Sequence, residues 1–180
     1  MLTIRDGWKK MDYIKKHNMF AQVGENCYFQ SNILPAEPFL VYLHNNVAIS
    51  AGVRLVTHSS VNTVFNHEEN TDTYLCRYGK VEIGNNVYIG ADAIINYGVT
   101  IGDNIVVGSM SLVSRDLHSG GVYAGNPCMK IMDYSEFTEK HRNKMKESPV
   151  FDDSYIIGEI TDEKRIEMKK MLEKGIGYIV

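Results

Sequence analysis

From residue 83 the sequence divides into consecutive segments of six residues, and the first residue of each segment is β-branched and aliphatic. The fifth position is apolar or small, and the second is mostly glycine. The first positions are Ile83, Ile89, Ile95, Ile101, Val107 and Val113, and the fifth positions are Val87, Ala93, Val99, Ile105, Ser111 and Leu117. Because roughly a quarter of the residues in an average chain are branched and apolar, six of them in one register indicate a true repeat.

A period of six fits neither the α-helix, which repeats every 3.6 residues, nor the strand, whose sides alternate every two. It fits an all-β solenoid in which each hexapeptide supplies a short strand and a corner. Three hexapeptides, about 18 residues, complete one coil with three flat sides, and successive coils pair in parallel. We predict that the first positions point inward in stacked columns and that the fifth positions fill the interior near the corners. Glycine and asparagine should supply the unusual backbone angles of the corners.

The same register is present earlier, as LHNNVA, ISAGVR and LVTHSS, where Leu43, Ile49 and Leu55 lead and Val47 and Val53 stand fifth. Residues 23–32 predict one further partial coil. Two segments interrupt the period. Residues 33–39 carry two prolines and predict a loop, and residues 59–82 are polar and too long for a corner. We expect the longer segment to be an excursion from the coil with a functional role, because long structured loops in compact domains are often functional.

The two ends of the chain predict helices. Ile4, Trp8, Met11 and Ile14 recur at helical spacing, so residues 1–20 are expected to form a helical cap over the first coil. Residues 21–131 would form the coil, and residues 132–180 a helical C-terminal extension that packs on the outside of the coil or on a neighbouring subunit. Its helices are expected at Tyr134–Ser148 and at Thr161–Lys174, with Thr161 as N-cap and Gly175 as the stop.

Charge and composition exclude several classes of partner. The 19 Lys and Arg residues nearly balance the 22 Asp and Glu residues, so neither nucleic acid nor an anionic membrane is an expected partner. The N-terminal segment lacks the apolar core of a signal peptide, and no apolar run is long enough to cross a bilayer, so we expect a cytoplasmic protein. Cys27, Cys76 and Cys128 are scattered and are expected to be free, buried thiols.

The segment from IGNNVYIG to YAGNP, within residues 20–131, closely resembles the hexapeptide-repeat acyltransferase superfamily. Within it, the segment resembles the maltose and galactoside O-acetyltransferases and the bacterial capsular-polysaccharide O-acetyltransferases. The resemblance implies a left-handed parallel β-helix and a homotrimer with active sites in the clefts between subunits. The stretch NNVAISAGVRLVTHS is similar to the part of the sugar acetyltransferases that ends in the catalytic histidine, which is His58 here.

An imidazole suits the reaction that this resemblance implies. Acetyl transfer from the thioester acetyl-coenzyme A requires a sugar hydroxyl to lose its proton as it attacks the carbonyl, and neutral histidine is a suitable base near neutral pH. His58 follows the last inward residue of its coil, so we expect it to project into a groove. It would take the acceptor's proton and return it to the coenzyme A thiolate, with no covalent intermediate.

The resemblance also implies positions for the coenzyme, along an outer groove of the β-helix. Ala91, Ser109 and Ser114 would offer backbone groups to the pantetheine arm, and Arg115 would meet the phosphates. Tyr88 stands where the sugar acetyltransferases often carry tryptophan, as a flat wall for the pantetheine or the acceptor. The family's AGNPAK has become AGNPCMK, which moves the basic residue to Lys130 and puts that phosphate contact in doubt.

Other functions stay open at this point. The same fold could serve an N-acetyltransferase acting on an amino sugar, an antibiotic acetyltransferase, or a non-catalytic trimeric scaffold. Zinc hydration chemistry is disfavoured, because His58 and His67 are nine residues apart and have no obvious third ligand, so no metal is expected. His17, His44, His118 and His141 are interpreted as structural or solvated residues.

Overall fold

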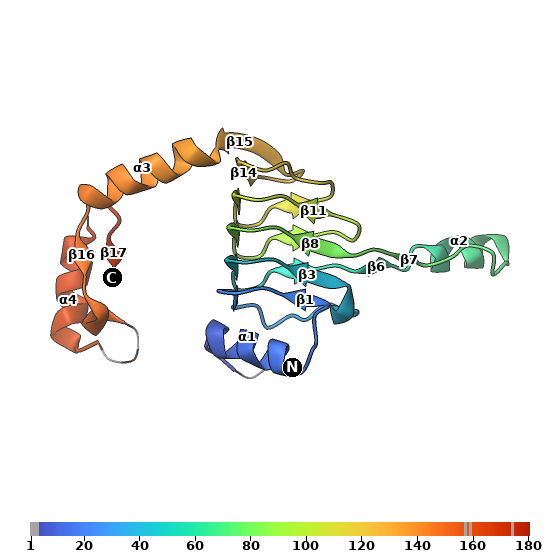
Figure 1. Cartoon of the computed structure of the whole chain (residues 1–180), viewed down its shortest axis with the longest axis horizontal. Helices are drawn as coiled ribbons and strands as arrows, with labels where there is room; N and C mark the ends of the chain where they lie inside the picture. Colours follow the sequence, from blue (N-terminus) through green and yellow to red (C-terminus); the bar gives the residue numbers. More distant parts are fainter. Residues whose placement is uncertain (1–3, 157, 159, 174) are drawn as a thin grey trace. The chain divides into compact units, whose positions relative to one another are not determined.

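The computed structural model describes residues 4–156, 158, 160–173 and 175–180. The chain forms two compact units, one up to Tyr134 and one from Ser135 to Val180 (Figure 1). In the first unit the chain passes in turn through three sheets, and the strands that successive coils add to a sheet pair in parallel.

The strands of each sheet are short, as the hexapeptide period predicts. The first sheet contains β1 (Gln22–Val23), β3 (Val41–Leu43), β8 (Val81–Ile83) and β11 (Thr100–Ile101). The second contains β2 (Tyr28–Phe29), β4 (Val47–Ile49), β9 (Val87–Ile89), β12 (Ile105–Val107), β14 (Gly121–Ala124) and the antiparallel β15 (Met129–Asp133). The third contains β5 (Arg54–Leu55), β10 (Ile94–Ile95) and β13 (Leu112–Val113).

Strand register confirms that one coil contains three hexapeptides. Ile83 pairs with Ile101 in the first sheet, and Ile95 pairs with Val113 in the third. Both pairs are therefore separated by three hexapeptides, as an 18-residue coil requires. Equivalent inward residues stack directly over one another, which is the arrangement that a solenoid needs to bury a continuous core.

The inward positions are those that the pattern predicts. All six first-position residues are at most 1% exposed, and the fifth-position residues are at most 4% exposed. Ser111 is the one polar residue among them, and its hydroxyl donates to the Gly108 carbonyl at 2.7 Å and accepts from the Gly125 amide at 3.1 Å. Burial of this hydroxyl is tolerated because both of its hydrogen-bonding roles are satisfied.

The corners use glycine in two ways: fourth-position glycines such as Gly98 (φ 76°) supply unusual backbone angles as predicted, whereas those in second place have another role. Positive φ angles occur at the fourth position of the hexapeptide, as in Asn86 (56°) and Asn104 (55°), rather than at the glycines in second place. A Cβ on Gly90 would lie 2.5 Å from the Ser109 amide nitrogen of the next coil. The second-position glycines are therefore required for close approach of successive coils, whereas asparagine supplies the left-handed backbone.

The excursion is structured and shorter than expected. β6 (His58–Ser59) pairs antiparallel with β7 (Arg77–Tyr78), and α2 (Asn62–Glu69) lies at the far end of this hairpin (Figure 1). The coil resumes with β8 at Val81, so the predicted boundary at residue 82 is wrong by two residues. Val81 is fully buried and pairs with Val41, which requires it to belong to the coil.

A helix packs against the first coil, and its buried face includes an unexpected lysine. In α1 (Gly7–Lys16), Met11 and Ile14 are buried, whereas Trp8 is 55% exposed. Lys10 is fully buried, and its Nζ donates to the Gln30 and Ser31 carbonyls and to Asn32 Oδ1 at 2.7–3.0 Å. The ammonium group thereby joins the cap to the irregular segment after β2.

We expect Lys10→Met to lower the free energy of unfolding by about 2–4 kcal/mol, because it leaves three acceptors without their donor. Lys9→Met is the matched control, since Lys9 is exposed on the same helix. Urea unfolding of both variants measures the difference. Equal stability of the two variants would show that the Lys10 contacts contribute nothing.

The C-terminal part contains the predicted helices but also strands that the pattern missed. β15 turns back along β14, so the chain after Pro127 is not helical until α3 (Tyr134–Lys146). In the second unit, β16 (Val150–Phe151) pairs with β17 (Tyr178–Ile179), with the 3₁₀ turn η2 (Asp153–Tyr155) between them in sequence. α4 (Asp162–Met171) begins after its N-cap Thr161, as predicted. The predicted end at Lys174 lies outside the described residues. Among those residues, no helix is long and apolar enough to span a membrane.

Candidate active site

His58 lies where the third sheet ends and the excursion begins. It follows β5 by three residues and is the first residue of β6, so the coil and the hairpin together fix its backbone. Its side chain is 33% exposed, which leaves part of the imidazole open to a ligand. This placement agrees with the prediction that His58 projects outward at a corner.

Glu37 holds the His58 ring. Its Oε2 lies 2.9 Å from His58 Nδ1 and also accepts a hydrogen bond from the Thr57 hydroxyl at 2.5 Å. The hydrogen bond from Thr57, followed by that from His58, lowers the pKa of the Glu37 carboxyl below its ordinary value. An ionised carboxylate can only accept hydrogen bonds, so Nδ1 carries the proton, and in the neutral imidazole Nε2 is the nitrogen with a free lone pair. In that tautomer the partly exposed ring can accept a proton at Nε2.

Glu37 is a site residue that the sequence pattern does not predict. It lies in the proline-containing segment 33–39, directly before the short 3₁₀ turn η1 (Pro38–Leu40). The pattern predicts only a loop for this segment, and the contact of Glu37 with His58 crosses 21 residues of sequence. The one available signal was a lone carboxylate in an interruption of the repeat. Only the stacking of coils brings this carboxylate beside the histidine.

An aromatic residue lies opposite the histidine. β6 and β7 place the Cα of Tyr78 directly across from that of His58, and the two ring centroids are 5.5 Å apart with a 39° tilt. The Tyr78 side chain is 61% exposed. The excursion begins at His58, and its return strand β7 places the ring of Tyr78 beside the imidazole.

The proposed coenzyme positions occupy neighbouring corners of the coil. Ala91 and Ser109 lie on successive coils where the second sheet leads into the third, and the Met110 amide donates to the Ala91 carbonyl at 2.8 Å. Ser114 and Arg115 follow β13 directly and are exposed. These four residues flank the third sheet, the sheet that precedes His58.

Arg115 and Lys130 line one cavity of about 490 Å³, together with His118 and Tyr123. Two basic side chains in one hollow provide a site suited to phosphate groups. Lys130 Nζ is paired with Asp133 at 2.7 Å, and this carboxylate raises the pKa of the lysine. The pairing keeps Lys130 protonated but offsets part of its charge.

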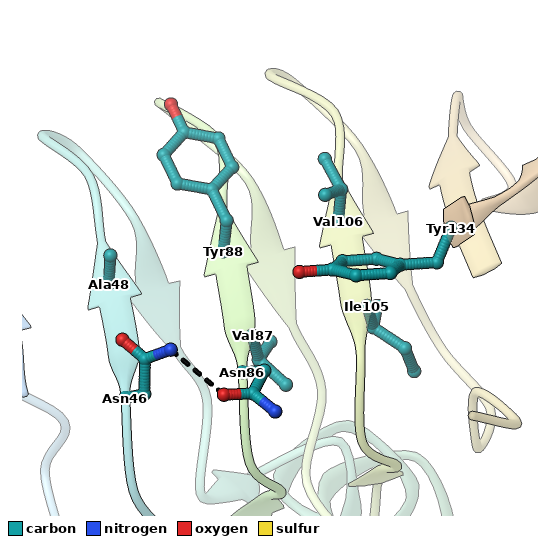
Figure 2. A pocket seen from close by; sticks show the side chains of 8 residues that line it. All are labelled: Asn46, Ala48, Asn86, Val87, Tyr88, Ile105, Val106 and Tyr134. Atoms are coloured by element: carbon teal, nitrogen blue, oxygen red, sulfur yellow. Dashed lines mark hydrogen bonds between the residues drawn. The ribbon is translucent and has the colours of Figure 1, made fainter. Parts of the chain in front are cut away.

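Tyr88 is separated from these residues. It projects from the outer face of the second sheet into a smaller cavity of about 150 Å³ that also contains Ala48 and Tyr134. Figure 2 shows the Tyr134 ring lying across Val106, with its hydroxyl directed toward the strand that carries Tyr88. The structure therefore does not bring Tyr88 into the cavity of Arg115 and Lys130.

The remaining candidate residues have local partners. His44 Nε2 lies 3.1 Å from Glu82 Oε1, so this pair resembles His58 and Glu37 in chemistry but lies on another sheet. Cys27 and Cys128 are buried thiols as expected, whereas Cys76 is only half-buried because it lies in the projecting hairpin. Over the described residues, no three His, Cys, Asp or Glu side chains gather in a group that could hold a metal ion.

The repeat seen in the coil is also found when the chain is compared with known proteins. Residues 80–115 match the bacterial transferase hexapeptide family (six repeats). The chain is 37% identical over 120 residues to a galactoside O-acetyltransferase of Escherichia coli K12, a match that covers 66% of this chain but only 56% of that enzyme. It is 36% identical over 132 residues to the protein CapG of Staphylococcus aureus, covering 72% of this chain and 74% of CapG. A solved galactoside acetyltransferase in complex with coenzyme A superposes with a TM-score of 0.54 at 28% identity, over 73% of each chain.

The parallel pairing of residues 18 positions apart defines a protein of the hexapeptide-repeat class. With the similarity to CapG over most of both chains, the comparison shows that this chain belongs to the hexapeptide-repeat acyltransferase family. The resemblance inferred from the repeat is thereby confirmed.

Proposed function

We propose that this protein transfers acetyl from acetyl-coenzyme A to a hydroxyl of a sugar or a polysaccharide precursor, with His58 as general base. The observation that carries the proposal is the hydrogen bond from His58 Nδ1 to the ionised Glu37, which leaves Nε2 as a proton acceptor at the surface. The similarity to a galactoside O-acetyltransferase supports the substrate class.

In this mechanism Nε2 of His58 removes the proton of the acceptor hydroxyl as its oxygen attacks the thioester carbonyl. The new C–O bond forms, the C–S bond breaks, and the imidazolium returns its proton to the coenzyme A thiolate. Glu37 accepts from Nδ1 throughout, so it orients the ring and stabilises the imidazolium between the two proton transfers. The coenzyme would lie along Ala91, Ser109 and Ser114, with its phosphates near Arg115.

Three further features belong to the same proposal. We infer that the coil is left-handed, that three copies assemble with the active sites between them, and that the protein acts in the cytoplasm. The first two rest on the family resemblance, and the third repeats the expectation drawn from the apolar pattern of the sequence. A trimer is also consistent with a His58 that stands at a corner, where a neighbouring coil would complete a cleft.

The test is release of thiol from acetyl-coenzyme A across a panel of galactosides, glucosides, amino sugars and chloramphenicol. Preferred turnover on sugar hydroxyls supports the proposal, whereas turnover confined to amino groups or to chloramphenicol replaces it with N-acetyl or antibiotic transfer. Isothermal titration with coenzyme A separates these outcomes from a scaffold, which would bind no coenzyme.

Arg115→Gln should raise the Kd for coenzyme A about tenfold, because a hydrogen bond to a charged phosphate is lost. If Arg115 contacts the 3′-phosphate, the affinities of the parent protein and of Arg115→Gln should differ less for 3′-dephospho-coenzyme A than for coenzyme A. The control is Arg165→Gln, which removes the same charge from α4 in the second unit. Equal affinity of the two variants would contradict the placement of the phosphates.

A further inference from the structure

The position of Tyr78 is fixed by backbone pairing and not by packing of its own side chain. Its Cα is in register with that of His58 in the antiparallel pair β6–β7, and the neighbouring pair joins Ser59 to Arg77. Side chains of directly opposed residues lie on the same face of a two-stranded sheet. Tyr78 therefore shares a face with the imidazole, and Arg77 lies on the other face.

This ring remains largely open although it is apolar. It is 61% exposed, more than the other tyrosine of the hairpin, Tyr74, which is 38% exposed, packs against Phe65 and donates to Glu69. The ring of Tyr78 contacts the imidazole at 5.5 Å and leaves most of its surface without a protein partner among the described residues. An exposed aromatic ring beside a basic nitrogen is a feature expected of a binding site.

The charge around the ring suits a neutral acceptor with hydroxyl groups. The Cys76 side chain, and more weakly the Glu37 carboxylate, hold the pKa of the Tyr78 phenol above its ordinary value. The phenol is thus uncharged near neutral pH and can both donate and accept a hydrogen bond. An apolar ring with a neutral polar tip matches a pyranose, which has an apolar C–H face and a rim of hydroxyls.

We propose that Tyr78 is the acceptor platform of this enzyme: its exposed ring stacks against the C–H face of a sugar and presents one hydroxyl to Nε2 of His58. This inference rests on the proposed function and names a residue that selects ring-shaped acceptors. Because the platform is carried by the return strand of the excursion, it belongs to a different segment of the chain from the residues to which we assign the coenzyme.

The experiment compares Tyr78→Leu and Tyr78→Phe with Tyr13→Leu, which removes a 40% exposed tyrosine from α1. Steady-state kinetics with the best sugar of the panel should show an acceptor KM raised about tenfold or more in Tyr78→Leu. The KM for acetyl-coenzyme A should be unchanged in every variant, and Tyr13→Leu should stay within about twofold of the parent protein. Tyr78→Phe keeps the ring and loses only the phenol hydroxyl, so its acceptor KM should rise less than that of Tyr78→Leu.

Two results would overturn the platform. One is an unchanged acceptor KM in Tyr78→Leu. The other is a reduced kcat with an altered pH profile and unchanged KM, which would mean that Tyr78 only positions the imidazole.

Saturation-transfer NMR with methyl β-galactoside, without acetyl-coenzyme A, separates this inference from the reaction itself. Loss of saturation transfer to the sugar's C–H protons in Tyr78→Leu supports the platform, whether or not the protein releases thiol. Absence of thiol release in the parent protein would overturn the proposed reaction and leave the platform standing. Absence of any binding of the sugar by the parent protein overturns the platform. Retained transfer in Tyr78→Leu does the same, whatever the rate of thiol release.

Discussion

His58→Ala should lower kcat/KM for acetyl transfer about 10²- to 10⁴-fold, the range that a positioned general base contributes. The Kd for coenzyme A should not change, because the residues assigned to the coenzyme lie at another corner or, as Ser114 and Arg115 do, two coils further along the corner of His58. Initial rates of thiol release at acceptor concentrations below KM measure the first quantity, and calorimetric titration measures the second.

His44→Ala is the matched control for this variant. His44 has nearly the same side-chain exposure, 35% against 33%, and it also pairs with a glutamate. Both variants remove an imidazole from the outside of the coil, so they should perturb folding similarly. Full turnover in His58→Ala, or an equal loss in His44→Ala, would show that the assigned base is wrong.

Glu37→Gln should have the second-largest effect, a loss of roughly tenfold to 10³-fold in kcat with little change in either KM. The amide can donate as well as accept, so it no longer dictates which nitrogen of His58 carries the proton, and it no longer stabilises the imidazolium. The loss should be smaller than that for His58→Ala because the base itself remains. Removing this negative charge should also move the acid limb of the pH–rate profile to lower pH.

Glu82→Gln is the matched control, since Glu82 pairs with His44 and its pKa is likewise lowered, first by Lys80 and then by His44. It should leave both kcat and the pH profile unchanged. If Glu37→Gln shows parent-like kinetics, Glu37 does not position the base and the histidine acts alone.

The lowered pKa of Glu37 has a consequence for stability. A carboxyl whose pKa is depressed in the folded state contributes stability above its unfolded pKa of about 4, and this contribution is lost as the pH falls through the lower folded value. The hydrogen bond between His58 and the ionised Glu37 is therefore intact at neutral pH and is lost only in acid. Loss of activity between pH 8 and pH 5 cannot then be assigned to protonation of Glu37.

The repeat was readable from the sequence because a solenoid places one side chain of each hexapeptide in the same environment. Ile95 illustrates this: its β-branched side chain, its place in the sixfold register and its complete burial between neighbouring coils all agree. The corner of His58 followed from the same register, because inward positions end at Leu55. The coil register and the outward placement of this histidine were therefore determined locally.

What the tertiary structure alone decided are the contacts between segments that have no common period. Glu37 reaches His58 from an interruption of the repeat, Tyr78 returns to it after a helix, and Lys10 is buried against residues of the segment after β2. Each contact depends on where an irregular segment re-enters the stack, and that is set by packing across coils. Hydrophobic periodicity reports only which side of its own strand a residue occupies. The corner that carries His58, the proposed base, could therefore be located from the sequence, but the carboxylate and the aromatic ring beside it could not.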